Sequence, residues 1–546
     1  MEFDYIIVGA GSAGCLLANR LSESGKYTVC LLEAGPKDRN PFIHIPAGFT
    51  KTISDKKINW LYATEPSWGT NGRSIPTPRG KVIGGSSSIN GLVYSRGSKE
   101  DFNSWAQKGN IGWGYDDLLP CFRKIENYLQ KESPHKKNRE KDIFYRGHRG
   151  ALTVTDLRWR DPLCEAFISA AQSFGMPLNK DYNSSTQEGV SYVQRTTRGR
   201  FRISSADAFL KPIEKRKNLH VKANVMVTKI IIEKKNAVGI CFKNFLRYGK
   251  EETMFSRREV IISCGAINSP QLLQISGIGP GNLLNSKGIK VLHNLIGVGE
   301  NLRDHYATRL TARAKNVETI NELSKGRKLF GEIIKYSIGQ KSILELGPTL
   351  VYCFWHSDQN VRNNDLQITF TPASYAKGQQ AKLDKEPGFS ITTWPQRPES
   401  SGWVRIKSAN PFEKPIVQPN YLSSIQDQRV LLSGIKLSRN IMRSPKMSKY
   451  FDYEVYPGNH IETDEELLSM ARERSTTTYH VMGTCRMAPL QSDASAVVDH
   501  KLRVHGISNL RVIDASIMPM IPSANINAAV MAIAEKGANL ILAEER

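Results

Sequence analysis

The stretch Tyr5-Ile6-Ile7-Val8-Gly9-Ala10-Gly11-Ser12-Ala13-Gly14 decides the fold of this 546-residue chain. It consists of a short apolar strand pattern and a Gly-x-Gly-x-x-Gly turn, and the apolar run that follows, to residue 21, predicts a helix. Gly9 permits the tight turn, Gly11 lets the backbone approach a pyrophosphate at the helix N-terminus, and Gly14 allows the helix to pack closely on the strand. The pattern predicts a dinucleotide-binding α/β unit.

An acidic residue follows the second predicted strand. Residues 27–32 are apolar and end at Glu33, which lies 19 residues after Gly14. A carboxylate at this distance hydrogen-bonds a ribose diol and repels a 2′-phosphate, which disfavours NADP. The alternative is a glycine-rich turn in another kind of α/β unit. Residues 297–302 lack a third glycine and residues 277–282 carry a proline in the loop, so we expect one dinucleotide, either FAD or NAD.

Composition places the chain among globular proteins. It is 40% apolar and 23% charged, which excludes disordered and collagen-like classes. The net charge of +23 attracts anions, and it admits nucleic acid, anionic membranes or anionic substrates without selecting among them. Eight cysteines without a CxxC pair predict buried reduced thiols rather than a zinc ribbon or a disulfide scaffold.

The N-terminus predicts where the protein resides. The first strand pattern begins too early for a secretory signal, and no apolar stretch reaches the roughly 18 residues of a spanning helix. We therefore expect a cytoplasmic protein without a transmembrane segment, and peripheral contact with an anionic membrane stays open.

Further motifs follow in a fixed order: RGKVIGGSSSING at 79–91, GAINSPQLL at 265–273, GVGENLRDH at 297–305, YHVMGTCRM at 479–487, LRVIDAS at 510–516 and SANINAA at 523–529. With the N-terminal fingerprint, the chain resembles the glucose–methanol–choline (GMC) oxidoreductases, in particular their choline-dehydrogenase-like bacterial branch. The resemblance covers about residues 3–310 and 390–546 and is weak across about 311–389.

The resemblance implies an α/β fold in two parts. One is an FAD-binding Rossmann-like domain with a doubly wound parallel sheet, expected at residues 1–155, 215–310 and 475–546. The other is an α+β substrate-binding domain built on an antiparallel sheet, expected at 156–214 and 311–474. Residues 366–370 and 403–406 alternate like strands of a sheet with one wet face. Residues 526–542 predict a helix that starts at the flavin.

The resemblance also implies the cofactor, FAD. Gly9, Gly11 and Gly14 would hold its pyrophosphate, Glu33 its adenosine ribose, and Val227 would lie beside the adenine. Some relatives attach FAD through a histidine in the glycine–serine loop, where this chain has Ile89, so we expect non-covalent FAD. The other expected cofactor-binding residues are Ser12, Ala13, Ala34, Arg79, Gly84, Gly85, Ser86, Asn90, Gly91, Asp514, Ala515 and Asn527.

His480 and Asn525 match the family's reactive pair, with Asn525 placed by counting ten residues back from Glu535. A neutral histidine can accept the hydroxyl proton of an alcohol, and an asparagine amide can donate a hydrogen bond to the developing alkoxide. Flavin N5 accepts the hydride, which no side chain can do. The expected reaction converts an alcohol to an aldehyde or ketone, and the electrons then pass to O₂ or another acceptor.

Other conspicuous residues are expected to have a structural role rather than a catalytic one. His305 and Cys485 are expected to serve packing, and no metal site is expected. The charged run at 134–141 predicts a solvated loop. No GxSxG elbow supports a serine hydrolase, and no helix-turn-helix, RNA-recognition or zinc spacing supports a nucleic-acid partner.

The substrate alternatives remain open. The net positive charge favours a neutral or aromatic primary alcohol over choline, although a local carboxylate or aromatic cage would accommodate a cation. Choline oxidation, by a dehydrogenase or an oxidase, is one alternative. A hydroxynitrile lyase with redox-idle FAD is the other.

Overall fold

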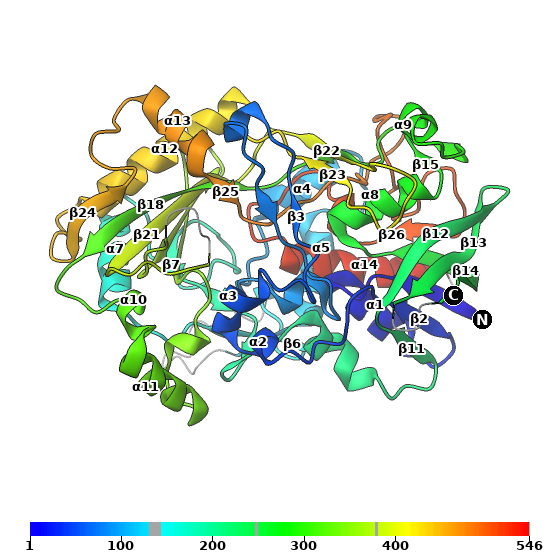
Figure 1. Ribbon diagram of the computed structural model, residues 1–546, viewed down its shortest axis with the longest axis horizontal. Coiled ribbons are helices and arrows are strands. Elements are labelled where there is room, and N and C mark those ends of the chain that lie inside the picture. Colours follow the sequence, from blue (N-terminus) through cyan, green and yellow to red (C-terminus); the bar gives the residue numbers. More distant parts are fainter. Residues whose placement is uncertain (130–143, 246–248, 377–380, 545–546) are drawn as a thin grey trace.

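The computed structural model describes residues 1–129, 144–245, 249–376 and 381–544, so the charged run at 134–141 lies outside the described residues. Two seven-stranded sheets organise the molecule, one on the right and one on the left of Figure 1. The first sheet contains the N-terminal fingerprint. The second is built from the middle of the chain, together with a short strand near residue 190 and another near residue 476.

The first sheet has the order β11-β2-β1-β14-β13-β12, with β26 beside β14. Its strands are β1 (Glu2–Val8), β2 (Val29–Leu32), β11 (Leu219–Lys222), β12 (Val225–Glu233), β13 (Asn236–Asn244), β14 (Glu252–Ile262) and β26 (Leu510–Val512). The pairings of β11, β2, β1, β14 and β26 are parallel, as predicted, but β12 and β13 pair antiparallel, so the sheet is mixed. The cause is local: only Lys234 and Lys235, both with positive φ, separate the two strands, and a two-residue hairpin makes them antiparallel.

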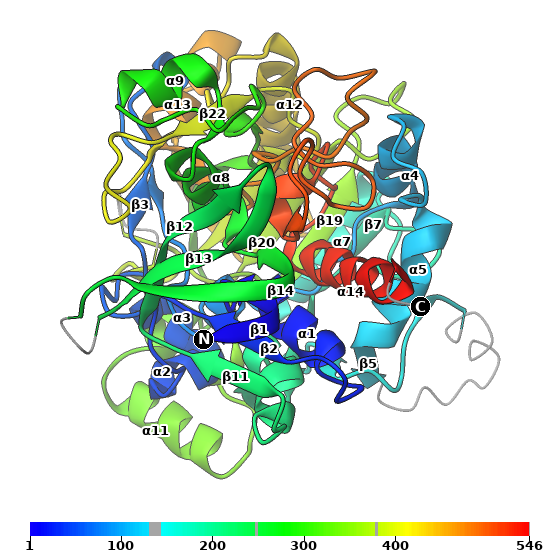
Figure 2. The same cartoon turned by 90° about the vertical axis from the view of Figure 1, so that its right-hand side faces the viewer.

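Helices bury the apolar residues of the fingerprint. The predicted N-terminal helix is α1 (Ser12–Leu21), and the predicted C-terminal helix is α14 (Asn527–Glu544). These two helices pack on one another, and α14 also contacts α5 (Tyr115–Ile125), an arrangement visible in Figure 2. Residues from β1, α1 and α14 share one buried core, in which Tyr5, Leu16 and Ile533 are fully enclosed.

The second sheet is antiparallel throughout, in the order β24-β18-β21-β20-β19-β7 with β25 beside β18. Its strands are β7 (Gly189–Tyr192), β18 (Tyr306–Ala314), β19 (Val351–Trp355), β20 (Leu366–Thr371), β21 (Gly388–Pro395), β24 (Phe451–Tyr456) and β25 (Thr476–Thr477). Helices α7 (Pro162–Ser173) and α12 (Ile425–Met442) cover one face, where Phe167 of α7 stacks on Phe370 with ring centroids 4.5 Å apart.

The prediction of a wet sheet face needs two corrections. β20 alternates apolar and polar residues, but all six are buried, because its hydroxyl-bearing face lines a cavity inside the molecule. The second predicted strand is β22 (Gly402–Arg405), and it belongs to a separate three-stranded sheet with β17 (Glu300–Leu302) and β23 (Ile416–Gln418). Alternation reveals that a strand has a polar face, but not whether that face meets solvent or a cavity.

Shorter elements complete the described chain. The remaining helices are α2 (Pro41–His44), α3 (Phe49–Thr52), α4 (Lys99–Gln107), α8 (Gly265–Ile275), α9 (Gly281–Ser286), α10 (Ile320–Leu323), α11 (Gly326–Ser337) and α13 (Asp464–Arg474). The remaining strands are β3 (Tyr62–Ala63), β4 (Pro76–Thr77), β5 (Glu126–Leu129), β6 (Leu152–Asp156), β8 (Gln194–Arg195), β9 (Thr197–Arg198), β10 (Phe201–Arg202), β15 (Ile278–Gly279) and β16 (His293–Asn294). Among the described helices, none is both long and apolar enough to cross a membrane. The eight cysteines, all in the described part of the chain, are free thiols.

Candidate active site

One cavity extends from the fingerprint turn to the polar face of the second sheet. It brings together residues that are hundreds of positions apart in the sequence. Of the predicted site residues, Gly14 and Gly84 do not line it. Those that do are Gly9, Gly11, Ser12, Ala13, Glu33, Ala34, Arg79, Gly85, Ser86, Asn90, Gly91, Val227, His480, Asp514, Ala515, Asn525 and Asn527.

The fingerprint turn is as tight as its glycines predict. Gly9 has a φ of +99°, and a Cβ on Gly14 would lie 1.9 Å from the carbonyl oxygen of Gly9. Gly14 therefore acts through packing, which explains why it lies outside the cavity lining. The glycine–serine loop rests on the same turn, because a Cβ on Gly85 would lie 2.7 Å from the Cα of Gly11. The backbone of both segments thus borders the same end of the cavity.

Glu33 closes this end at the tip of β2. Its carboxylate accepts hydrogen bonds from the backbone N–H groups of Ala10, at 3.0 Å, and Gly35, at 2.9 Å. Burial raises the pKa of Glu33 to about 7, and the two N–H donors and the nearby Lys81 oppose that rise. The carboxylate is therefore held in a fixed orientation beside the turn.

Residues near the C-terminus return to the fingerprint. Asn527, the first residue of α14, accepts a hydrogen bond from the hydroxyl of Ser12 at 2.7 Å. Asp514 accepts hydrogen bonds from the N–H of Gly265, at 2.8 Å, and from the hydroxyl of Ser269, at 2.5 Å. These bonds link residues about 250 and 500 positions apart, so this part of the cavity exists only in the folded chain.

At the other end of the cavity, His480 meets Asn525. The Nδ2 of Asn525 lies 3.0 Å from the Nε2 of His480, and the Oδ1 of Asn525 accepts a hydrogen bond from the Tyr352 hydroxyl at 2.8 Å. Asn527, two positions later, instead bonds Ser12. The pairing predicted between His480 and Asn525 is therefore present in the geometry, and Tyr352 is a contact that the sequence did not indicate.

Hydrogen bonds fix the tautomer of His480. The Nε2 of His305 lies 2.8 Å from the carbonyl oxygen of Gln396, and a carbonyl only accepts, so His305 carries its proton there. The bare Nδ1 of His305 lies 3.0 Å from the Nδ1 of His480, which must therefore be the donor. Thr478 agrees, because its hydroxyl donates to the carbonyl of His305 and leaves its oxygen to accept from His480 Nδ1 at 2.8 Å. It follows that Nε2 of His480 has an unprotonated lone pair.

Both histidines are held neutral. Burial is the main cause that lowers the pKa of His305 to about 4 and that of His480 well below its usual 6.5, and His305 and Arg79 lower that of His480 further. Asp304 fixes both backbones, because it accepts from the N–H of His480 at 2.8 Å and of His305 at 2.9 Å. The chemical result is a neutral imidazole whose unprotonated Nε2 lies at the cavity wall and accepts a hydrogen bond from Asn525.

Sequence reasoning missed several residues of the site. His305 was expected to serve packing, yet it contacts His480 directly. Tyr352 lines the cavity from β19, in the region where the family resemblance is weakest, and Arg309 lines it from β18, at the edge of that region. The available signal was the run of hydroxyl-bearing residues at alternate positions of β20 and β21, but only the folded sheet shows that they face His480 rather than solvent.

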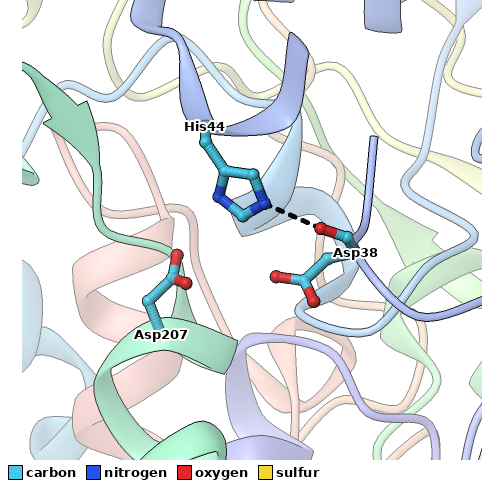
Figure 3. Close-up of side chains that lie close together, drawn as sticks. All are labelled: Asp38, His44 and Asp207. Carbon is cyan, nitrogen blue, oxygen red and sulfur yellow. Dashed lines mark hydrogen bonds between the residues drawn. The ribbon is translucent and has the colours of Figure 1, made fainter. Parts of the chain in front are cut away.

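A cluster elsewhere has the composition of a metal site. Asp38, His44 and Asp207 place potential ligand atoms within 4.8 Å of one another, and Figure 3 shows the three side chains converging. Lys211 already neutralises this cluster, because its ammonium lies 2.7 Å from Asp38 and 2.6 Å from Asp207. His44 uses Nε2 to donate to the backbone oxygen of Asp38 at 2.7 Å. The geometry is that of a partly exposed ion-pair cluster, in which the Lys211 side chain is 42% exposed.

The fold and the cavity define the chain as a GMC oxidoreductase. The family's N-terminal model matches residues 3–307 and its C-terminal model matches residues 398–534. The chain therefore belongs to the GMC oxidoreductase family, and it is an FAD-dependent enzyme that oxidises the CH–OH group of an alcohol.

Individual relatives are similar over their full lengths. An alcohol dehydrogenase [acceptor] of Pseudomonas putida is 40% identical over 99% of this chain and 96% of its own. The mitochondrial choline dehydrogenase of Homo sapiens is 38% identical over 99% and 90%. Among solved structures, pyridoxine 4-oxidase from Mesorbium loti has a TM-score of 0.87 at 30% identity, covering 98% of each chain. Formate oxidase of Aspergillus oryzae RIB40 has a TM-score of 0.90 at 28% identity, covering 100% and 98%.

Proposed function

We propose that this chain oxidises an alcohol with His480 as the general base and Asn525 as the hydrogen-bond donor to the alcohol oxygen. The observation that carries the proposal is the unprotonated Nε2 of a neutral His480, which accepts a hydrogen bond from the Asn525 amide at 3.0 Å at the cavity wall and would take the substrate hydroxyl proton in its place. A base and a donor that converge on one point suit a hydroxyl group, whose proton must leave while its oxygen gains charge.

The cofactor end of the cavity fits FAD. The fingerprint turn and the glycine–serine loop offer backbone at close approach, because both lack side chains where they meet. We propose that Gly9, Gly11, Ser12 and Ala13 hold the pyrophosphate and that Glu33 and Ala34 hold the adenosine ribose beside Val227. The flavin and its ribityl chain then contact the loop residues Arg79, Gly85, Ser86, Asn90 and Gly91 and the C-terminal residues Asp514, Ala515 and Asn527.

Attachment of the FAD is expected to be non-covalent. Ile89 lines the cavity in the glycine–serine loop, and its aliphatic side chain has no atom that could bond the flavin. When bound, FAD supplies the hydride acceptor that the reaction needs. We also propose that the two domains follow the predicted division, with boundaries near residues 155, 214, 310 and 474.

Residues of this chain accept the hydroxyl proton of the alcohol and orient the groups around it. Nε2 of His480 accepts the hydroxyl proton, and Nδ1 keeps its own proton because His305 and Thr478 both accept from it. Tyr352 holds the amide oxygen of Asn525, so the amide N–H groups point away from the tyrosine and toward His480. Asp304 fixes the two separate segments that bear His305 and His480, because it accepts a hydrogen bond from the backbone N–H of each histidine.

Anaerobic mixing tests this proposal. The purified yellow protein would be mixed without oxygen with aliphatic, benzylic, furanic and pyridine-type alcohols and choline, with His480→Ala as the control. We expect bleaching of the flavin by one class of alcohol in the wild type and none in the variant. Admission of air then separates use of O₂ from use of another acceptor, by the speed at which the colour returns. Bound flavin that no alcohol bleaches would contradict the proposal, and a cyanohydrin-cleavage assay would follow.

A further inference from the structure

We propose that Arg309 binds an anionic group on the alcohol substrate, so that the preferred substrate is a hydroxy compound with a carboxylate distant from its reacting carbon. The proposal rests on alcohol oxidation as the function of the site and specifies its substrate class. The proposal extends the substrate class expected from the sequence, neutral or aromatic alcohols, to alcohols that also carry a negative charge.

A row of four residues crosses the polar face of the second sheet. Tyr352 pairs with Thr369, Thr369 with Thr392, and Thr392 with Arg309, on β19, β20, β21 and β18 in turn. All four line the cavity. Residues directly opposite on neighbouring strands point to the same face, so this row forms one wall that leads from the tyrosine that holds Asn525 to a guanidinium.

The guanidinium of Arg309 is available for a ligand. Among the described residues, none forms a side-chain hydrogen bond or an ion pair with this guanidinium, although the side chain is half-buried. Its Cζ lies 4.2 Å from the ring centroid of Tyr375, on which the guanidinium stacks. Stacking on a ring leaves the N–H edges of a guanidinium free to form paired hydrogen bonds with a carboxylate. By contrast, Arg79, the other cavity arginine, already donates to the backbone oxygens of Pro78 and Tyr479.

The wall around Arg309 offers no negative charge. The acidic residues that line the cavity are Glu33 and Asp514, and both are held at the cofactor end by the backbone bonds described above. The strands of the second sheet contribute hydroxyls, aromatic rings and Arg309, with no carboxylate among their cavity residues. A cationic substrate such as choline would therefore approach a like charge without a counter-charge, whereas an anion would gain a partner.

The spacing along β18 sets the expected size of the substrate. Arg309 of β18 lies four residues beyond His305, which directly precedes the strand, and at about 3.4 Å per residue their Cα atoms are about 14 Å apart. The flexible arginine side chain shortens this separation toward the cavity. The anionic group and the reacting carbon therefore need several intervening atoms, as in a para-substituted benzyl alcohol or a medium-length ω-hydroxy acid.

Three matched alcohols test the charge preference. They are 4-(hydroxymethyl)benzoate, 4-methylbenzyl alcohol and the trimethylammonium analogue with the charge at the same para position. We expect wild-type kcat/KM for flavin reduction to fall in that order. In Arg309→Gln the carboxylate substrate should lose about 10- to 100-fold, while the neutral alcohol changes less than threefold. Arg309→Lys should retain part of the preference. Arg160→Gln, at an exposed arginine that stacks on Tyr192 outside the cavity, is the control.

A binding measurement distinguishes the proposed role of Arg309 from the proposed alcohol oxidation. The non-oxidisable 4-methylbenzoate should perturb the flavin spectrum of the holoenzyme, and Arg309→Gln should weaken its Kd by the same factor as it lowers kcat/KM. Equal effects of Arg309→Gln on all three alcohols, or unchanged carboxylate binding, would overturn the role of Arg309 and leave alcohol oxidation standing. Carboxylate binding without flavin reduction by any alcohol would support the role of Arg309 as an anion-binding residue and would overturn alcohol oxidation as the function.

A second and independent observation concerns α11. Phe330, Ile333 and Ile334 are 64%, 44% and 46% exposed, and their spacing places them on one side of the helix; Ile338, which directly follows the helix, is 64% exposed. The opposite side is anchored: Glu332 accepts from the N–H of Ile343 at 2.9 Å. Figure 1 shows α11 projecting at the lower left edge of the molecule.

From this arrangement we infer that α11 docks on an anionic lipid surface. Residues 325–341 contain five basic side chains, all exposed, and one acidic side chain, the buried Glu332. An exposed apolar helix face flanked by lysine and arginine is suited to binding at the lipid headgroup boundary, where the apolar side chains are buried and the basic side chains contact anionic lipids. The net charge of +23 attracts the whole molecule to the same surface.

Vesicle sedimentation tests this inference. The holoenzyme should sediment with phosphatidylglycerol-containing vesicles, less with phosphatidylcholine alone, and less at high salt. The double variant Phe330→Ser/Ile334→Ser should lower the bound fraction at least tenfold, whereas Ile425→Ser, at a 65% exposed isoleucine at the start of α12, should not. Equal binding by both variants would overturn the inference. So would light scattering that shows a dimer broken by the α11 variant, because a second copy would then cover the patch.

Discussion

At the residue scale, the active site contains a series of four hydrogen-bonded side chains, and the hydrogen bonds fix which atom of each one carries the proton. The order runs from the Gln396 carbonyl through His305, His480 and Asn525 to Tyr352. Each link follows from the donor and acceptor capacity of its neighbour. A base is useful only in the right tautomer, and here a second histidine, buried and bonded to the backbone, selects it.

His305 should therefore act as a positioning residue. His305→Leu removes one of the two acceptors for Nδ1–H of His480 and leaves Thr478 as the other, and we expect flavin reduction to slow by about 10- to 100-fold. His305→Asn places an amide oxygen near the lost Nδ1 and should recover most of the rate. Stopped-flow reduction with one alcohol would compare both variants, and equally slow rates in the two would show that His305 serves packing alone.

The pH dependence follows from the lowered pKa of His480. Because the protonated form is disfavoured by burial, by His305 and by Arg79, the imidazole remains neutral when the pH falls through 6.5. The base is thus present over the whole neutral range and is lost only at much lower pH. We expect the anaerobic reduction rate to stay constant from pH 8 to pH 6, and a half-maximal rate near pH 6.5 would contradict this assignment.

At the element scale, the fingerprint turn depends on contacts that admit no side chain. Gly14 packs α1 against the turn at Gly9, and the glycine–serine loop in turn packs on Gly11. These contacts are between backbone atoms, so no rotamer change can relieve an added methyl group. The motif is therefore a steric requirement for the relative position of β1, α1 and the loop.

A pair of glycine variants tests this requirement. Gly14→Ala would place Cβ 1.9 Å from a backbone oxygen, and we expect a protein that retains little FAD and unfolds at a lower temperature. Gly331→Ala is the matched control within α11, where nothing lies within 4 Å of the new Cβ. It should bind FAD normally and gain up to about 1 kcal/mol from helix propensity. Flavin absorbance per protein and the thermal midpoint would report both, and normal FAD content in Gly14→Ala would refute the steric argument.

At the scale of the whole molecule, a buried charge cluster joins distant segments. Glu126 pairs with both Arg96 and Arg146, and Arg146 also reaches Asp181 at 2.6 Å. The three central side chains are at most 1% exposed. The two guanidinium groups and the N–H of Gly147 hold the pKa of Glu126 below its usual value. The cluster therefore contributes stability only while Glu126 is ionised.

Removal of that charge should destabilise the fold. Glu126→Gln leaves two buried guanidinium groups without their carboxylate, and we expect a loss of about 3–5 kcal/mol. Because the folded pKa is depressed, the contribution of Glu126 is complete above its unfolded pKa of 4.5 and disappears as the pH falls below that value. Thermal unfolding of the holoenzyme at pH 7 and pH 4 would show a difference between wild type and variant that shrinks at the lower pH. Asp464→Asn, in an exposed pair with Lys436, should change little.

The features that could be predicted from the sequence are those that depend on local chemistry. Gly9, Gly11, Gly14 and Glu33 predict a strand, a turn, a helix and a dinucleotide because steric limits and spacing act within about 30 residues. The resemblance placed His480 and Asn525, and the folded chain brings them within hydrogen-bond distance. What each polar face meets depends on the tertiary structure: the hydroxyls of β20 line a cavity, His305 contacts His480, and Arg309 lies on a sheet face that contributes no carboxylate to the cavity. These relations join residues 10 to 200 positions apart, and periodicity along one strand carries no information about the strand that pairs with it.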